Sequence, residues 1–242
     1  MPRRRTSKSA TARRDQDLVD PEWVAKLSDR SLEEARGAVE EAQKDTPFVR
    51  TIDLAHQQAG RDFYAQIRAP FELYALVRLL RPKHVVEAGV SSGVSSAYFL
   101  KALNQNHFGT LHSIDLPTRQ KGATFREKED SPVALPPGKS SGWAVPPHLR
   151  AGWDLRIGPS QELLPSLVSE LDQVDLFLHD SLHTFEHATF EFTTVDPKMP
   201  SHGVLLADNT AWLGGALDRF AASKGVRALY RRGMDLGGFR KP

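Results

Sequence analysis

Oxygen-bearing side chains follow two of the apolar segments in the second half of the chain. Asp180 follows the segment 174–178, and Asp208 and Asn209 follow the segment 204–207. If these segments are parallel strands of one sheet, their carboxyl ends lie at one edge, and the three side chains can converge there. Two carboxylates and an amide oxygen suit Mg²⁺, which would lower the pKa of a hydroxyl group bound to it. The pattern predicts a metal site; the alternative is two helix caps and a turn.

A histidine lies three residues after Asp180, at the expected start of the next helix. An imidazole can act as a general base near neutral pH, so His183 is the candidate for removing the proton of a hydroxyl group. The alternatives are a polar core histidine or a helix cap. His179 and His187 flank this position and the three histidines could indicate zinc, but the neighbouring oxygen ligands argue against a zinc site.

A second group of candidate residues lies where an earlier apolar segment runs into a turn. The sequence VVEAGVSSG at 85–93 contains Gly89 and Gly93, which allow tight turning of the backbone and close approach of a ligand. The spacing is not the G-x-G-x-x-G of dinucleotide-binding proteins, and it is not a P-loop. Glu87 in this segment would repel a pyrophosphate, whereas it suits a ligand with a cationic amino group.

The next apolar segment also ends in an acid. Asp115 follows the segment 110–114, and a carboxylate at that position can accept hydrogen bonds from both hydroxyl groups of a ribose. A glycine turn and an aspartate at a strand end are each weak signals alone. Together, and in this order along the chain, they predict a nucleotide-type site.

These residues require strands that run in one direction, and the hydrophobic pattern predicts them. Apolar segments of strand length alternate with segments of helical periodicity. The strands are expected at 84–88, 110–114, 155–157, 174–178, 204–207, 227–230 and 237–239, and the helices at 95–103, 160–171, 186–192 and 216–223. The expected fold class is therefore α/β: a Rossmann-like, doubly wound, mainly parallel seven-stranded sheet with helices on both faces.

The expected domain organisation has three parts. They are a disordered basic tail at 1–16, an N-terminal helical segment at 17–80 with helices at 20–43 and 71–80, and the α/β domain at 81–242. A stretch rich in proline and glycine interrupts the α/β domain at 117–153. Because this stretch leaves the carboxyl end of the second strand, we expect a lid or an acceptor-binding loop, with an irregular surface insertion as the alternative.

Composition narrows the class of protein. With 40% hydrophobic and 26% charged residues the chain fits one globular domain. Since it has no cysteine, disulfides, thiolate nucleophiles and cysteine-ligated zinc are excluded. The basic tail is expected to be a solvated segment, with contact to nucleic acid as the alternative. The tail lacks the apolar region of a secretory signal and no apolar run has the length of a membrane span, so we expect a cytoplasmic protein.

Five stretches of the sequence resemble a known family. VVEAGVSSGVSS and SIDLP resemble the cofactor motifs of class I S-adenosylmethionine-dependent methyltransferases. GPSQELLPSL, VDLFLHDSLHTFEH and GVLLADN are similar to the catechol O-methyltransferase group and to small-molecule and sugar O-methyltransferases. The resemblance covers about residues 66–240, and the motifs are specific in combination because their order and spacing match over four consecutive strands.

The resemblance implies a role for each candidate residue. It places the methionine moiety of the cofactor at Glu87, Gly89, Ser92 and Gly93 with Ser95 near its carboxylate, the ribose at Asp115, the adenine at Ser160 and Gln161, and Mg²⁺ at Asp180, Asp208 and Asn209. Asp180 is also counted with the cofactor site. His183 takes the place of the lysine base of the catechol enzymes. Two features depart from the family: the catechol enzymes have no loop like 117–153, and other members have Asp-Asp in place of Asp208-Asn209.

The expected function is S-adenosylmethionine-dependent, metal-assisted O-methylation of a small molecule with a diol, catechol or sugar hydroxyl. One alternative is a metal-independent methyltransferase in which His183 alone is the base. A nucleic-acid methyltransferase is disfavoured because no Asn/Asp-Pro-Pro-Tyr-type motif is present. A non-catalytic nucleotide-binding protein is a further alternative, and the glycine spacing disfavours a dehydrogenase. The expected partner is the small-molecule acceptor, with neither nucleic acid nor membrane, and homo-oligomerisation stays open.

Overall fold

The structure is a computed structural model that describes residues 19–59, 69–117 and 135–242. The predicted disordered basic tail at 1–16 lies outside the described residues, as does the part of the predicted loop between 118 and 134. None of the helices within the three described ranges is long and apolar enough to cross a membrane.

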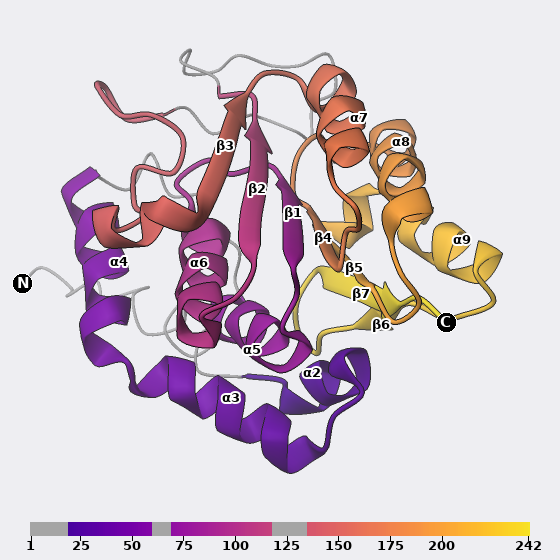
Figure 1. The fold of residues 1–242 in the computed structure, drawn as a ribbon, viewed down its shortest axis with the longest axis horizontal. Coiled ribbons are helices and arrows are strands. Elements are labelled where there is room, and N and C mark those ends of the chain that lie inside the picture. Colours follow the sequence, from indigo (N-terminus) through magenta and orange to yellow (C-terminus); the bar gives the residue numbers. More distant parts are fainter. Residues whose placement is uncertain (1–18, 60–68, 118–134) are drawn as a thin grey trace, which may run out of the picture.

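Seven strands of the described chain form one sheet in the order β3-β2-β1-β4-β5-β7-β6 (Figure 1). They are β1 (His84–Ala88), β2 (Thr110–Asp115), β3 (Trp153–Ile157), β4 (Leu176–His179), β5 (Val204–Asp208), β6 (Leu229–Tyr230) and β7 (Leu236–Arg240). Strands β1 to β5 pair in parallel, whereas β7 is antiparallel to both β5 and β6. The strand order reverses between β1 and β4, which is where such folds bind ligands. The predicted fold class is confirmed.

Helices cover both faces of this sheet (Figure 1). One layer consists of α2 (Pro21–Ser28), α3 (Leu32–Lys44), α4 (Thr46–Ala59), α5 (Pro70–Leu80) and α6 (Val94–Asn106), and the other of α7 (Ser160–Glu170), α8 (Phe185–Val195) and α9 (Ala216–Ser223). Short 3-10 turns lie at Pro147–Gly152, Asp196–Lys198 and Thr210–Trp212. Each layer packs on its own hydrophobic core.

The strands supply both cores because successive side chains of a strand point to opposite faces. In β1, Val85 joins the core under α5 and α6, whereas Val86 joins the core under α7 and α8. In β4, Leu176 and Leu178 face the first core and Phe177 faces the second. A parallel strand that is buried on both faces is apolar at nearly every position, which explains the continuous apolar segments of the sequence.

The N-terminal helices differ from the prediction in two respects. The expected helix at 20–43 is two helices, because Asp29 adopts a left-handed conformation at the end of α2 (φ 54°) and Ser31 caps α3 through a capping box with Glu34. Helix α4 was not predicted. It buries only one narrow stripe, which includes Phe48 and Ile52, so its sequence carries a weak periodic signal.

Candidate active site at the carboxyl ends of the strands

The turn after β1 lies against the end of β4. Gly89 has a φ of +94°, and a Cβ atom at this residue would overlap the carbonyl group of Asp180. The Gly89 amide donates to the carbonyl oxygen of Ile114 at 2.9 Å, and the Asp180 amide donates to that of Ala88 at 2.8 Å. The ends of β1, β2 and β4 are therefore in contact through their backbones, and only glycine fits at position 89.

The second glycine of the turn begins helix α6. Gly93 has a φ of +85°, and a Cβ atom there would lie 2.7 Å from the Cα of Gly142. The start of α6 therefore lies between the turn and the segment 135–152. Because the first amides of a helix have no partner within it and carry partial positive charge, this helix end can hold an anionic group such as a carboxylate.

Glu87 is fully buried beneath the turn. Its Oε1 accepts a hydrogen bond from Ser95 Oγ at 2.5 Å, and its Oε2 accepts from Ser96 Oγ at 2.6 Å and from Ser113 Oγ at 2.7 Å. Burial raises the pKa of this carboxyl to about 7, in spite of the three serine donors. Both oxygens already have protein donors, so in this structure Glu87 and Ser95 contact each other and fix the turn. Ser92, which belongs to the turn, is also buried.

Asp115 joins the turn to the segment 135–152. Its Oδ1 accepts from the Val90 amide at 3.0 Å and from the Ser91 amide at 3.4 Å. Its Oδ2 accepts a hydrogen bond from the hydroxyl of Ser141, a residue that is itself buried. The carboxylate that was predicted to bind the ribose thus lies at the expected strand end, and a protein hydroxyl contacts it there.

The described part of the predicted loop packs on the cofactor turn. The Gly142 amide donates to the Ser91 carbonyl oxygen at 2.8 Å, and the Ala144 amide donates to that of Ser92 at 2.9 Å. Trp153, which begins β3, donates from Nε1 to Ser113 Oγ at 2.9 Å. Residues 135–152 therefore extend the wall of the site beside the turn. Their role as a lid stays a prediction.

Ser160 and Gln161 begin helix α7, which packs on the opposite face of the sheet from α6. Ser160 Oγ donates to Glu191 Oε1 at 2.6 Å, and Gln161 Nε2 lies 3.0 Å from His187 Nδ1. The two residues predicted to lie beside adenine are thus tied to helix α8 through Glu191 and His187. Glu191 was not predicted from the sequence, although its place one helical turn after His187 in an apolar helix could have indicated a buried acid.

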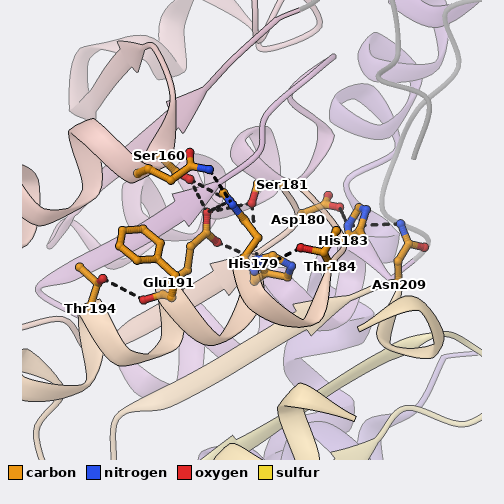
Figure 2. Close-up of polar contacts among 12 residues, drawn as sticks. Ser160, His179, Asp180, Ser181, His183, Thr184, Glu191, Thr194 and Asn209 are labelled. Carbon is orange, nitrogen blue, oxygen red and sulfur yellow. Dashed lines mark hydrogen bonds and ion pairs between the residues drawn. The ribbon is translucent and has the colours of Figure 1, made fainter. Parts of the chain in front are cut away.

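Several donors converge on the Glu191 carboxylate (Figure 2). Besides Ser160, it accepts from Ser181 Oγ at 2.8 Å and contacts His187 Nε2 at 2.9 Å and His179 Nδ1 at 2.6 Å. Burial would raise the pKa of Glu191, but the charge of His179 and the hydrogen bonds from His179 and His187 hold it well below its usual range. The network joins the ends of β4 and α7 through one ionised group.

The predicted base lies between two of the predicted metal ligands (Figure 2). His183 Nε2 is 3.4 Å from Asp180 Oδ1 and 3.4 Å from Asn209 Nδ2. Trp212 stacks edge-on near the same ring, with 6.0 Å between ring centroids. The structure therefore brings Asp180, His183 and Asn209 together at the carboxyl ends of β4 and β5, as the strand pattern predicted.

Asp208 is the last residue of β5 and completes this group. Burial and the negative charge of Asp180 raise the pKa of the Asp208 carboxyl to about 8, while His183 acts in the opposite direction. The effect of the Asp180 charge on Asp208 means that the two carboxylates lie within electrostatic range of one another. Two acids and an amide in this arrangement have the donor chemistry of a magnesium site.

The described residues contain no group of three or more His, Asp, Glu or Cys side chains that could hold a metal ion. The predicted metal ligands are of a different composition, because the third one is the amide of Asn209 and only the other two are carboxylates. The donor types fit Mg²⁺, and the metal site stays a prediction.

Apolar side chains are exposed at the same edge of the sheet. Leu116 follows Asp115 directly and is 56% exposed, and Ile157 at the end of β3 is 57% exposed. Trp212 is 46% exposed beside His183. The first two flank the ribose-binding candidate, where the base of a nucleotide could pack against them. Leu116 and Ile157 were not predicted as site residues, since a single apolar residue at a strand end carries no signal of its own.

The fold and these residues first define a class, an α/β enzyme with a nucleotide-type cofactor site at the carboxyl ends of its strands. A family model described as a methyltransferase domain then matches residues 86–210, about half of the chain. The chain belongs to this family, which confirms the predicted class of enzyme, an S-adenosylmethionine-dependent methyltransferase. No curated protein matches the chain significantly.

Solved structures share the fold at low sequence identity. An O-methyltransferase from Bacillus cereus in complex with SAH has a TM-score of 0.56 at 12% identity, over 81% of this chain and 91% of that one. TomG, an O-methyltransferase of tomaymycin synthesis from Streptomyces achromogenes in complex with SAM, has a TM-score of 0.53 at 17% identity, over 82% of this chain and 91% of that one. The SAH-bound methyltransferase PaMTH1 from Podospora anserina has a TM-score of 0.54 at 14% identity, over 100% of both chains.

Proposed function

We propose that the protein transfers the methyl group of S-adenosylmethionine to a hydroxyl group of a small molecule of the diol, catechol or sugar type. One observation carries this proposal: the turn at Gly89 packs directly on the backbone of Asp180. The predicted cofactor turn and the loop that holds the predicted base are thus adjacent. Methyl transfer requires this adjacency, because the acceptor oxygen must lie in line with the methyl group.

The cofactor would lie along the edge formed by β1, β2 and the start of α7. The first amides of α6 would hold its carboxylate, Asp115 would accept from its ribose, and Leu116, Ser160 and Gln161 would surround its adenine. The SAM and SAH complexes named above support this cofactor. When bound, it supplies a methyl group that is already activated by a sulfonium, so the protein has to position the acceptor and remove its proton.

His183 is the proposed general base. Its Nε2 has a partner in either protonation state, since a neutral ring can accept from the Asn209 amide and a protonated ring can donate to Asp180. Both contacts are long, at 3.4 Å, so a stronger hydrogen bond to a substrate hydroxyl can replace either of them. This arrangement lets the ring take up a proton in place.

Asp180, Asp208 and Asn209 would hold a divalent metal ion, for which Mg²⁺ fits the donor set. When bound, the ion lowers the pKa of an acceptor hydroxyl, and a vicinal diol or a catechol could chelate it. Without an ion, the same residues orient the base, because Asp180 and Asn209 both contact His183. This contact favours metal-independent methylation with His183 as sole base as the second candidate function.

Isothermal titration with S-adenosylhomocysteine (SAH), in Mg²⁺ and then in EDTA, tests the cofactor. Micromolar binding in both conditions is expected, because Asp180 is the only residue that the proposed cofactor and metal sites share. An absence of binding in both would overturn the proposal.

Turnover of diols, catechols and sugars in the same two conditions then tests the metal. Loss of turnover in EDTA, and in the Asp180→Ala variant with SAH affinity retained, is the result expected for the metal-assisted reaction. Full turnover in EDTA would identify the metal-independent one.

A further inference from the structure

Glu191 is a buried acid to which the proposed methyl transfer assigns no role. It lies on α8, it is completely buried, and four donors converge on it from three elements and from the loop after β4, which contains Ser181. Ser160 belongs to α7, His179 ends β4, and His187 lies one turn earlier on α8. A charge at this depth is costly unless each oxygen is well solvated by donors, so the network fixes the geometry of all its members.

The hydrogen bonds of this network determine which atom Gln161 presents to a ligand. An ionised Glu191 only accepts, so His187 must donate to it from Nε2. In the neutral form of His187 the lone pair is then at Nδ1, and the 3.0 Å contact with Gln161 Nε2 is a hydrogen bond that the Gln161 amide donates to that nitrogen. The side-chain oxygen of Gln161 is left as the acceptor, and no hydrogen bond within the described residues reaches it.

We propose that Glu191 is a positioning residue for the cofactor: through His187 it holds Gln161 with its oxygen toward the cofactor, where it accepts a hydrogen bond from the exocyclic amino group of adenine. This inference rests on the proposed function, which places adenine beside Ser160 and Gln161. Gln161 is exposed at the start of α7. Without the chain from Glu191 its amide could turn by 180° and present a donor, which would face the donor of adenine.

The inference distinguishes adenine from a base that carries an oxygen at the same position. S-inosylhomocysteine has a carbonyl in place of the amino group, so its oxygen would face the oxygen of Gln161. The wild-type protein is expected to bind SAH about tenfold more tightly than S-inosylhomocysteine, which is the scale of one good hydrogen bond. Isothermal titration with both compounds measures this preference.

Two variants test whether the preference depends on Glu191. Glu191→Gln places an amide where the network needs an acceptor, and His187→Leu removes the link to Gln161. In each, the preference for SAH is expected to fall to about twofold or less. In a Gln161→Ala background Glu191→Gln is expected to change the preference no further, which a merely structural role would not predict.

A matched control is available in the other layer. Glu72 is a buried carboxylate on α5 that pairs at 2.9 Å with Arg231, which lies between β6 and β7, whereas Glu191 lies in the layer of α7 to α9. Glu72→Gln is expected to lower the melting temperature and to keep the full preference for SAH. Melting temperatures of all variants show which of them fold, and His187→Leu carries the test should Glu191→Gln not fold.

The outcomes separate this inference from the proposed function. A wild-type protein that does not bind SAH would overturn both. A wild-type protein that binds SAH but has no preference over S-inosylhomocysteine overturns the inference alone. So does a preference that persists in folded Glu191→Gln and His187→Leu.

Discussion

The cofactor half and the acceptor half of the site differ in how tightly their polar side chains are bonded to the protein. On the cofactor half, at the ends of β1 and β2, Glu87 and Asp115 accept hydrogen bonds on both of their oxygens from the protein itself. On the acceptor half, at the ends of β4 and β5, Asp180 and Asn209 reach His183 only at 3.4 Å. One half is fixed internally, and the other keeps bonding capacity for a ligand.

This difference shows how one sheet edge can both hold a cofactor and perform chemistry. A cofactor of constant shape can be bound by backbone amides and glycines that a fixed turn presents in advance. An acceptor that must lose a proton needs side chains whose contacts can be exchanged. We therefore expect substitutions on the cofactor half to affect folding and binding, and substitutions on the acceptor half to affect turnover.

The largest effect is expected on the cofactor half, from Gly89→Ala. The added Cβ would overlap the Asp180 carbonyl, and the left-handed backbone disfavours alanine. We expect a loss of more than about 3 kcal/mol of unfolding free energy, together with the loss of SAH binding. Urea unfolding and titration calorimetry measure the two effects.

Gly37→Ala is the matched control for this prediction. Gly37 lies within α3, and nothing approaches a Cβ there within 4 Å. This variant is expected to be more stable than wild type by up to about 1 kcal/mol, because alanine favours the helix. A Gly89→Ala protein as stable as the control would show that the two halves are not in contact.

His183→Asn tests the acceptor half. Loss of a general base is expected to lower kcat by a factor of roughly 10² to 10⁴, with SAH affinity and unfolding free energy close to those of wild type. Single-turnover rates with an accepted substrate measure the effect. A variant that loses SAH affinity as much as turnover would mean that the two halves do not divide binding and chemistry.

The third effect is a pH dependence on the cofactor half. Burial raises the pKa of Glu87 from 4.5 to about 7, so the folded protein holds a proton that the unfolded chain releases between these values. The contribution to stability is therefore present below pH 4.5 and is lost as the pH rises to 7, on the order of 3 kcal/mol at about 1.4 kcal/mol per pKa unit.

Comparison with Glu87→Gln isolates this titration. The variant has no group that ionises at this position, so the unfolding free energy of wild type relative to the variant is expected to fall between pH 4.5 and 7. Denaturant unfolding at intervals across this range gives the difference. A difference that does not fall across this range would show that Glu87 is ionised in the folded state throughout and that the serines outweigh burial.

Local patterns in the sequence were sufficient to predict the sheet and the positions of the cofactor half and the acceptor half of the site. Strand β1 was predicted with its observed bounds, and Asp180 and Asp208 lie at neighbouring strand ends, as their positions after apolar segments indicated. Helix α4 was missed because its buried stripe is narrow, and the break at Asp29 was missed because the helical periodicity continues across it. Periodicity reports which face is buried and does not report where a backbone turns.

The sequence by itself determined the α/β class, the methyltransferase motifs and the residues at the sheet edge, because these follow from the order of short segments along the chain. Only the tertiary structure decided what those residues contact. Glu87 with Ser113, Asp115 with Ser141, and Ser160 with Glu191 are pairs separated by 26 or 31 positions. Such pairs form because the sheet and its helices bring distant segments together, and the pattern of a single segment does not specify them.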